Sequence, residues 1–182
     1  MPPEETSSAQ PSGAQYATAN AIEKILRAEG WLAGETSAEQ LAWCERAAAL
    51  LGPQVSAGAS LRDLLQLVFH YDARELLAKV ESHAALARSG AREVLRQLAL
   101  VLLDPVPLTG ERFKEVVNFL KDVTGLRSRE LFHPIRLALT GRAGEGELDR
   151  VILLLDEAAA LPFTVRVKSA RERIVEFCAS LD

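Results

Sequence analysis

Four arginines lie close together in the second half of the chain. Arg127, Arg129, Arg136 and Arg142 fall within sixteen residues. The guanidinium group is planar and permanently charged, and its fork of N–H donors can contact a phosphate or the edge of a base bidentately. Charge alone favours a solvated arginine face around a break between two helices. The alternative interpretation is a surface that recognises nucleic acid.

The same stretch contains the residues that should position these arginines. Gly125 is expected to end one helix, and Thr140 and Gly141 to end the next. Pro134 lies inside an otherwise helical pattern, where proline removes a backbone donor and clashes with the preceding turn. We therefore predict a break, with a new helix that begins near Pro134. Arg136 would then lie near the exposed start of that helix.

No other group of residues has the spacing of a reactive site. The three histidines, His70, His83 and His133, have no cysteine or carboxylate at ligand spacing, which argues against a metal centre. No general acid–base pair and no serine nucleophile stand out. The sequence therefore predicts no catalytic residue, no metal and no cofactor.

Ordered motifs surround the arginines. They read LKDVTG (120–125), LRSRELF (126–132) and PIRLALTG (134–141), followed by Glu147-Leu148 and VILLL (151–155). This order resembles the C-terminal anticodon-binding domain of bacterial glutamyl-tRNA synthetases. A weaker similarity upstream, in LVFHYD (67–72), EVLRQLALVL (93–102) and TGERF (109–113), extends the resemblance over roughly residues 43–176.

The resemblance implies an all-α fold and a tRNA partner, of the glutamate type. In that family the arginine of the P-[LI]-R motif contacts the first anticodon base, which corresponds to Arg136 here. Arg127, Arg129 and Arg142 would contact backbone phosphates, which position RNA without reading its sequence. The family's H-I-G-H and K-M-S-K-S elements are missing from this sequence. The resemblance thus implies a module that is not catalytic alone and that acts with a catalytic synthetase partner in trans.

Composition and periodicity independently favour helices. Hydrophobic residues make up 48% of the chain and aromatic residues only 5%, with Ala and Leu dominant, and these are good helix formers. We expect eight or nine helices with short loops in a compact multi-helix bundle. The expected helix N-caps are Ser37 (with Gln40 as a capping box), Ser60, Asp72, Ser89, Thr109 and Thr164. Gly52-Pro53 is expected to end a helix.

The chain divides into three parts by composition. Residues 1–16 are polar and rich in proline, and we expect a disordered tail. Residues 17–36 hold a short amphipathic helix, Thr18 to Ala28, and a linker. Residues 37–182 form the helical domain that resembles the anticodon-binding domain. Met1 and the polar tail favour a stand-alone chain over a fragment of a longer synthetase.

Charge is unevenly distributed along the chain. The net charge is −4, but residues 110–173 hold twelve Lys/Arg against ten Asp/Glu, whereas residues 1–109 hold nine against thirteen. The half that carries the motifs is thus the basic one, and its small excess predicts weak, salt-sensitive RNA affinity. The sequence contains no run of eighteen apolar residues, so it predicts no membrane span. Cys44 and Cys178 are too isolated to suggest a disulfide, which favours a cytoplasmic protein.

Two functions therefore stay open. One is a tRNA-binding module, and the other is a helical protein-interaction or scaffold domain that has lost tRNA binding. Four arginines on one open face would favour RNA. Carboxylates interleaved with them would favour the scaffold.

Overall fold

The computed structural model describes residues 17–181, and every regular element in that range is helical. The all-α prediction is confirmed. The predicted tail, residues 1–16, lies outside the described residues. The helices are α1 (Ala19–Ala28), α2 (Ala38–Ser56), α3 (Leu61–Phe69), α4 (Ala73–Leu77), α5 (Val80–Leu86), α6 (Ala91–Leu102), α7 (Gly110–Thr124), α8 (Ser128–Thr140), α9 (Glu147–Ile152), α10 (Leu155–Ala159) and α11 (Ala170–Leu181).

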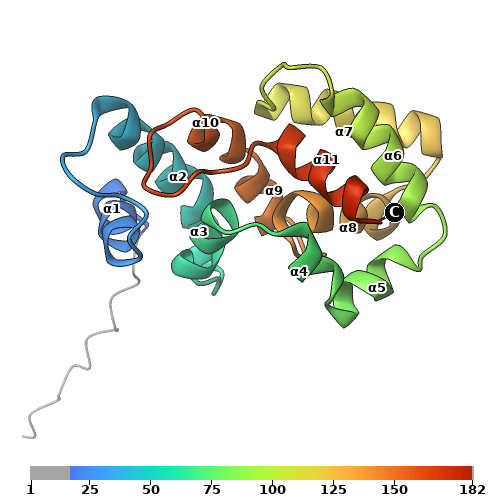
Figure 1. Ribbon diagram of the computed structural model, residues 1–182, viewed down its shortest axis with the longest axis horizontal. Helices are drawn as coiled ribbons and strands as arrows, with labels where there is room; N and C mark the ends of the chain where they lie inside the picture. Colours follow the sequence, from blue (N-terminus) through green and yellow to red (C-terminus); the bar gives the residue numbers. More distant parts are fainter. Residues whose placement is uncertain (1–16, 182) are drawn as a thin grey trace, which may run out of the picture.

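The helices form two neighbouring groups. Figure 1 shows α1, α2, α3 and α10 at one end of the molecule and α4 to α8 at the other. Helix α9 joins them, because it packs on α2 and α3 on one side and on α8 on the other. Helix α11 returns across the second group and packs on α4, α6 and α8. One continuous hydrophobic core runs through both groups.

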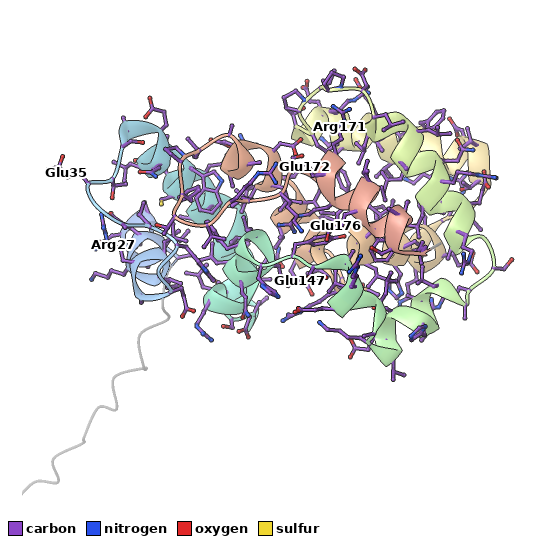
Figure 2. The ribbon with its side chains drawn as sticks, viewed as in Figure 1. Arg27, Glu35, Glu147, Arg171, Glu172 and Glu176 are labelled. Carbon is purple, nitrogen blue, oxygen red and sulfur yellow. The ribbon has the colours of Figure 1, made fainter. Side chains whose placement is uncertain are left out.

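Helix α1 is part of this core. Ile22 and Leu26 are completely buried, and α1 packs on α2. In the last turn of the helix, Arg27 (Figure 2) donates to the carboxylate of Glu23 and to the hydroxyl of Thr36, which ties the following loop back to α1. The predicted boundary between residues 36 and 37 stays a prediction.

Most of the predicted helix caps are confirmed. Ser37 and Gln40 form both hydrogen bonds of a capping box, and the side chains of Ser60, Asp72 and Thr109 each accept from backbone N–H groups of the helices that they precede. At these sites local sequence alone decides where the helix begins, because the cap and its donors are at most three residues apart.

Two predicted helix boundaries are wrong. Helix α2 continues through Pro53 to Ser56. Ser89 is not a cap, since α6 follows Gly90, which has φ +82° and no capping side chain. An ideal Cβ on Gly90 would lie 2.6 Å from Cδ1 of Leu126. Close packing of a distant leucine, rather than a local capping hydrogen bond, therefore fixes this boundary.

Two expected helices are each divided into two, and the last helix begins later than expected. The helix expected after Asp72 is divided into α4 and α5, and the one expected over 147–160 into α9 and α10. The last helix begins at Ala170 and not at Thr164. Ser169 and Glu172 form a reciprocal capping box there, and the carboxylate of Asp156 accepts from the N–H of Ala170 at 2.8 Å. These three acceptors satisfy the N–H groups at the start of α11.

A buried arginine joins three parts of the fold. Arg173 of α11 is fully buried and donates to the carbonyls of Leu67, Val68, Leu139 and Lys168. Three of these carbonyls belong to the last turns of α3 and α8, where a cation is favourable to the helix dipole. Burial lowers the pKa of Arg173 to about 10, so the side chain stays charged at neutral pH. Arg173 was not among the predicted site residues.

Neither cysteine forms a disulfide among residues 17–181. Cys44 is buried and Cys178 is half-buried. Burial raises the pKa of the Cys44 thiol to about 11. None of the helices in residues 17–181 is both long and apolar enough to cross a membrane.

Candidate nucleic-acid interface

The arginine-rich stretch forms one continuous helix. Helix α8 runs from Ser128 to Thr140 with Pro134 inside it, so the predicted break is wrong. Proline at this position leaves the carbonyl of Glu130 without its helical donor, but Glu130 is exposed and solvent can satisfy that carbonyl. Every residue from Pro134 to Thr140 is buried, and this packing holds the helix together across the proline.

Arg136 is consequently buried in the middle of α8 and is not at an exposed helix start, as predicted. Its side chain is 9% exposed, and its Nε and Nη2 each donate to one oxygen of the Asp149 carboxylate at 2.8 Å. Its Nη1 donates to the carbonyl of Gly144 at 2.9 Å. The guanidinium carbon lies 4.8 Å from the centre of the Phe132 ring. Arg136 thus anchors the turn between α8 and α9, and only two of its five N–H groups remain available.

Replacing Arg136 with alanine is expected to lower the free energy of unfolding by about 2–4 kcal/mol. The variant leaves a largely buried carboxylate and a carbonyl without their donors, and the range allows for the 23% exposure of the Asp149 side chain. Urea unfolding followed by circular dichroism would measure the change. The matched control is Arg142→Ala, an exposed arginine six residues later, for which a change below about 0.5 kcal/mol is expected.

The other three arginines are exposed but do not form one cluster. Arg127 precedes α8 as its N-cap residue, and Arg129 lies in the first turn, 3.4 Å from the carboxylate of Glu145. Arg142 follows Gly141 at the opposite end of the helix. Because α8 has thirteen residues, its two ends are about 20 Å apart. Arg129 and Arg136 each contact a carboxylate, so acidic side chains are interleaved with the predicted arginine set.

A groove runs beside α8, between α7 and α9. It has a volume of about 860 Å³. The half-buried rings of Phe113 and Phe132 line it, and so does the carboxylate of Asp149. The complete lining is Gln54, Gly110, Glu111, Phe113, Lys114, Val117, Asn118, Lys121, Phe132, Gly146, Glu147, Asp149, Arg150 and Leu153. Figure 2 labels Glu147, at the start of α9.

Three cations of this groove have no acidic partner. Lys114 and Arg150 are exposed and Lys121 is half-buried, and within residues 17–181 none of them forms an ion pair. These cations were not among the predicted site residues. A signal was present, because Lys114 and Lys121 are seven residues apart in a helix and therefore lie on the same face. Arg150 joins them only through the packing of α9.

His133 lies on α8 close to several cations. Its Nε2 atom is buried and has no hydrogen-bond partner. Burial is the largest cause that lowers the pKa of His133, followed by the charge of Arg88. The imidazole is therefore neutral at pH 7 and contributes no positive charge to this surface. Among residues 17–181 no cluster of His, Cys, Asp and Glu side chains could hold a metal ion.

A helical domain with these motifs on α7, α8 and α9 matches a known family. The family model described as "Anticodon binding domain" matches residues 18–161. The chain belongs to this family, and the resemblance noted in its sequence is confirmed.

The similar proteins are longer glutamate–tRNA ligases. The chain is 31% identical over 136 residues to the glutamate–tRNA ligase of Bacillus velezensis. The aligned region covers 75% of this chain and 28% of the ligase. It is 31% identical over 135 residues to that of Geobacillus stearothermophilus, covering 74% and 27%. It is 28% identical over 154 residues to that of Exiguobacterium sibiricum, covering 81% and 31%. The chain thus spans roughly three-tenths of these relatives. No solved structure gives a significant match.

Proposed function

We propose that this chain binds tRNA and that the groove between α7 and α9 receives unpaired bases of the anticodon loop. The observation that carries the proposal is the combination of two aromatic rings, Phe113 and Phe132, with three unpaired cations in one groove of an anticodon-binding domain. Proteins read RNA mainly where bases are unpaired, by stacking them on aromatic rings. Cations at the edge of such a groove hold the phosphates.

The predicted arginines take different roles in this proposal. Arg127 and Arg129 contact phosphates beside the groove, and Arg142 does so at the far end of α8. Arg136 shapes the groove by fixing Asp149 and the turn that follows α8. A direct contact from Arg136 to the first anticodon base stays a prediction, and it would have to use the two N–H groups that Asp149 and Gly144 leave available.

The finer parts of the proposal concern the partners. The similar proteins are named glutamate–tRNA ligases, so we propose a tRNA of the glutamate type. The family model that matches residues 18–161 is an anticodon-binding domain, and we also propose that a catalytic partner supplies aminoacylation in trans.

Competition between two RNAs tests the proposed site. A labelled hairpin with the anticodon stem and loop of a glutamate tRNA is bound first, and either the unlabelled hairpin or a fully paired duplex of equal length is added. The hairpin is expected to compete at least about tenfold better, because a duplex offers no splayed bases to the groove. Equal competition would mean that binding is only electrostatic and that the groove reads no base.

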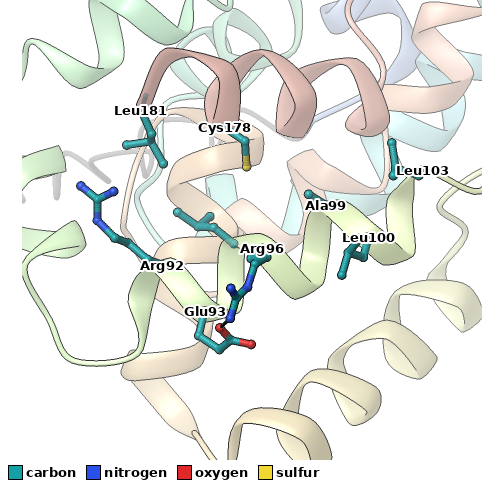
Figure 3. A pocket seen from close by; sticks show the side chains of 9 residues that line it. Arg92, Glu93, Arg96, Ala99, Leu100, Leu103, Cys178 and Leu181 are labelled. Carbon is teal, nitrogen blue, oxygen red and sulfur yellow. Dashed lines mark hydrogen bonds and ion pairs between the residues drawn. The ribbon is translucent and has the colours of Figure 1, made fainter.

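A second candidate function has its own support. Carboxylates are interleaved with the arginines, which favours a protein-interaction domain, and a second groove between α6 and α11 is partly apolar. Figure 3 shows Leu100 of α6, Leu103 at the C-cap of that helix and Cys178 of α11, which all line this groove. Leu100 is 58% exposed and Leu103 is 47% exposed. A folded chain that binds no tRNA at low salt would favour this second function.

A further inference from the structure

We infer that Asp149 makes the α7–α9 groove select a base that carries an exocyclic amino group over uracil. The inference rests on the proposed function and specifies which class of base the groove accepts. It depends on how the carboxylate is held, on which polar groups surround it, and on the hydrogen-bonding edges of the four bases.

The carboxylate of Asp149 is fixed by a neighbour that does not line the groove. Both of its oxygens accept from Arg136, through Nε and Nη2 at 2.8 Å each. A carboxylate offers about four acceptor positions, so the pair with Arg136 leaves about half of them for a ligand. The Asp149 side chain is 23% exposed, and it lines the groove, whereas Arg136 does not. The group that meets a base there is therefore an acceptor.

The other polar side chains of the groove are less constrained. Among the lining residues, Asp149 is the one whose side-chain polar atoms are fixed by hydrogen bonds within residues 17–181. The unpaired cations Lys114, Lys121 and Arg150 can reach phosphates from flexible stems. A polar group that is fixed before binding discriminates between ligands better than one that must be ordered on binding. Base choice is therefore assigned to Asp149.

The base edges then determine the preference. Cytosine and adenine present an amino group, and a carboxylate is a good acceptor for the N4 amino group of cytosine. Guanine also carries an amino group. Both exocyclic groups of uracil are carbonyl oxygens, and its one donor on that edge, N3–H, lies between them, so a carboxylate that accepts from N3–H meets a carbonyl oxygen on either side. A hydrogen bond to a charged group is strong enough to give about a tenfold difference in affinity.

The test uses two RNA hairpins with the same stem, one with an all-cytosine loop and the other with an all-uracil loop. Fluorescence anisotropy of the full chain should show the cytosine loop bound about tenfold more tightly. Asp149→Asn keeps one acceptor for Arg136 and turns an amide donor toward the ligand, so the preference should disappear or reverse. Asp122→Asn makes the same substitution at an exposed carboxylate outside the groove, and it should leave the preference unchanged.

A measurement on the unmodified protein covers the case in which Asp149→Asn does not fold. A loop of N4,N4-dimethylcytidine has no N4–H donor, and it should bind no better than the uracil loop. Equal affinity of the native chain for cytosine and uracil loops would overturn the inference. A cytosine preference that survives in folded Asp149→Asn, or with the dimethylated loop, would overturn it as well. If the native chain bound neither hairpin, the proposed function itself would fail.

Discussion

Replacing Arg173 with methionine is expected to lower the free energy of unfolding by about 3–5 kcal/mol. Methionine fills much of the same space but donates nothing to the four backbone carbonyls that Arg173 now satisfies. Each buried acceptor left without a donor costs about 1–3 kcal/mol. The carbonyls of Leu67, Val68 and Leu139 come from two different helices, so the loss should loosen the packing of α3 and α8 on α11.

Equilibrium unfolding in urea measures this change, and a neighbour supplies the control. Arg171 lies two residues earlier in the same helix (Figure 2), and it is exposed and forms no ion pair among the described residues. Arg171→Met should change stability by less than about 0.5 kcal/mol. A loss below about 1 kcal/mol for Arg173→Met would contradict the role assigned to this side chain.

Replacing Lys114, Lys121 and Arg150 together with alanine is expected to weaken tRNA binding roughly 50–150-fold at 0.15 M salt. Each lost phosphate contact makes the plot of log affinity against log salt shallower by about 0.7–0.9. At that concentration the change corresponds to a loss of affinity of about four- to fivefold. The salt dependence of the variant should therefore be shallower by about two to three units. The fold should be unaffected, because Lys114 and Arg150 are exposed and the half-buried Lys121 forms no ion pair among the described residues.

The matched control removes three cations of the same kinds from elsewhere on the surface. Lys24, Lys79 and Arg171 are exposed, form no ion pair among the described residues and lie outside the groove. Their triple replacement with alanine tests the effect of net charge alone. If both triple variants weakened binding equally, long-range charge rather than the groove would account for the affinity.

Local signals in the sequence predicted much of the fold. Ser37, Ser60, Asp72 and Thr109 begin their helices as expected, because a cap and the N–H groups that it satisfies are near neighbours in the chain. The reciprocal box of Ser169 and Glu172 was also present in the sequence. Thr164 was taken as the helix start instead, and the start of α11 was placed six residues too early.

Tertiary contacts decided the remaining features of the site. Proline usually ends a helix, but burial of the α8 residues that follow Pro134 keeps this helix continuous. Arg136 looked exposed because its partner, Asp149, lies thirteen residues later in a different helix. Arg173 and the α7–α9 groove depend on helices that are distant in the sequence. No local pattern could therefore have shown that the arginine with the strongest motif match is buried.

Titration of the chain with unfractionated tRNA at 50 mM and 200 mM salt tests the central claim most directly. The three groove cations alone should make affinity fall by at least about 20-fold between the two conditions, and phosphate contacts from Arg127, Arg129 and Arg142 would steepen the fall. Circular dichroism at both salt concentrations would establish that the chain is folded. No binding at 50 mM by folded protein, or an affinity that salt does not change, would contradict tRNA recognition by this domain.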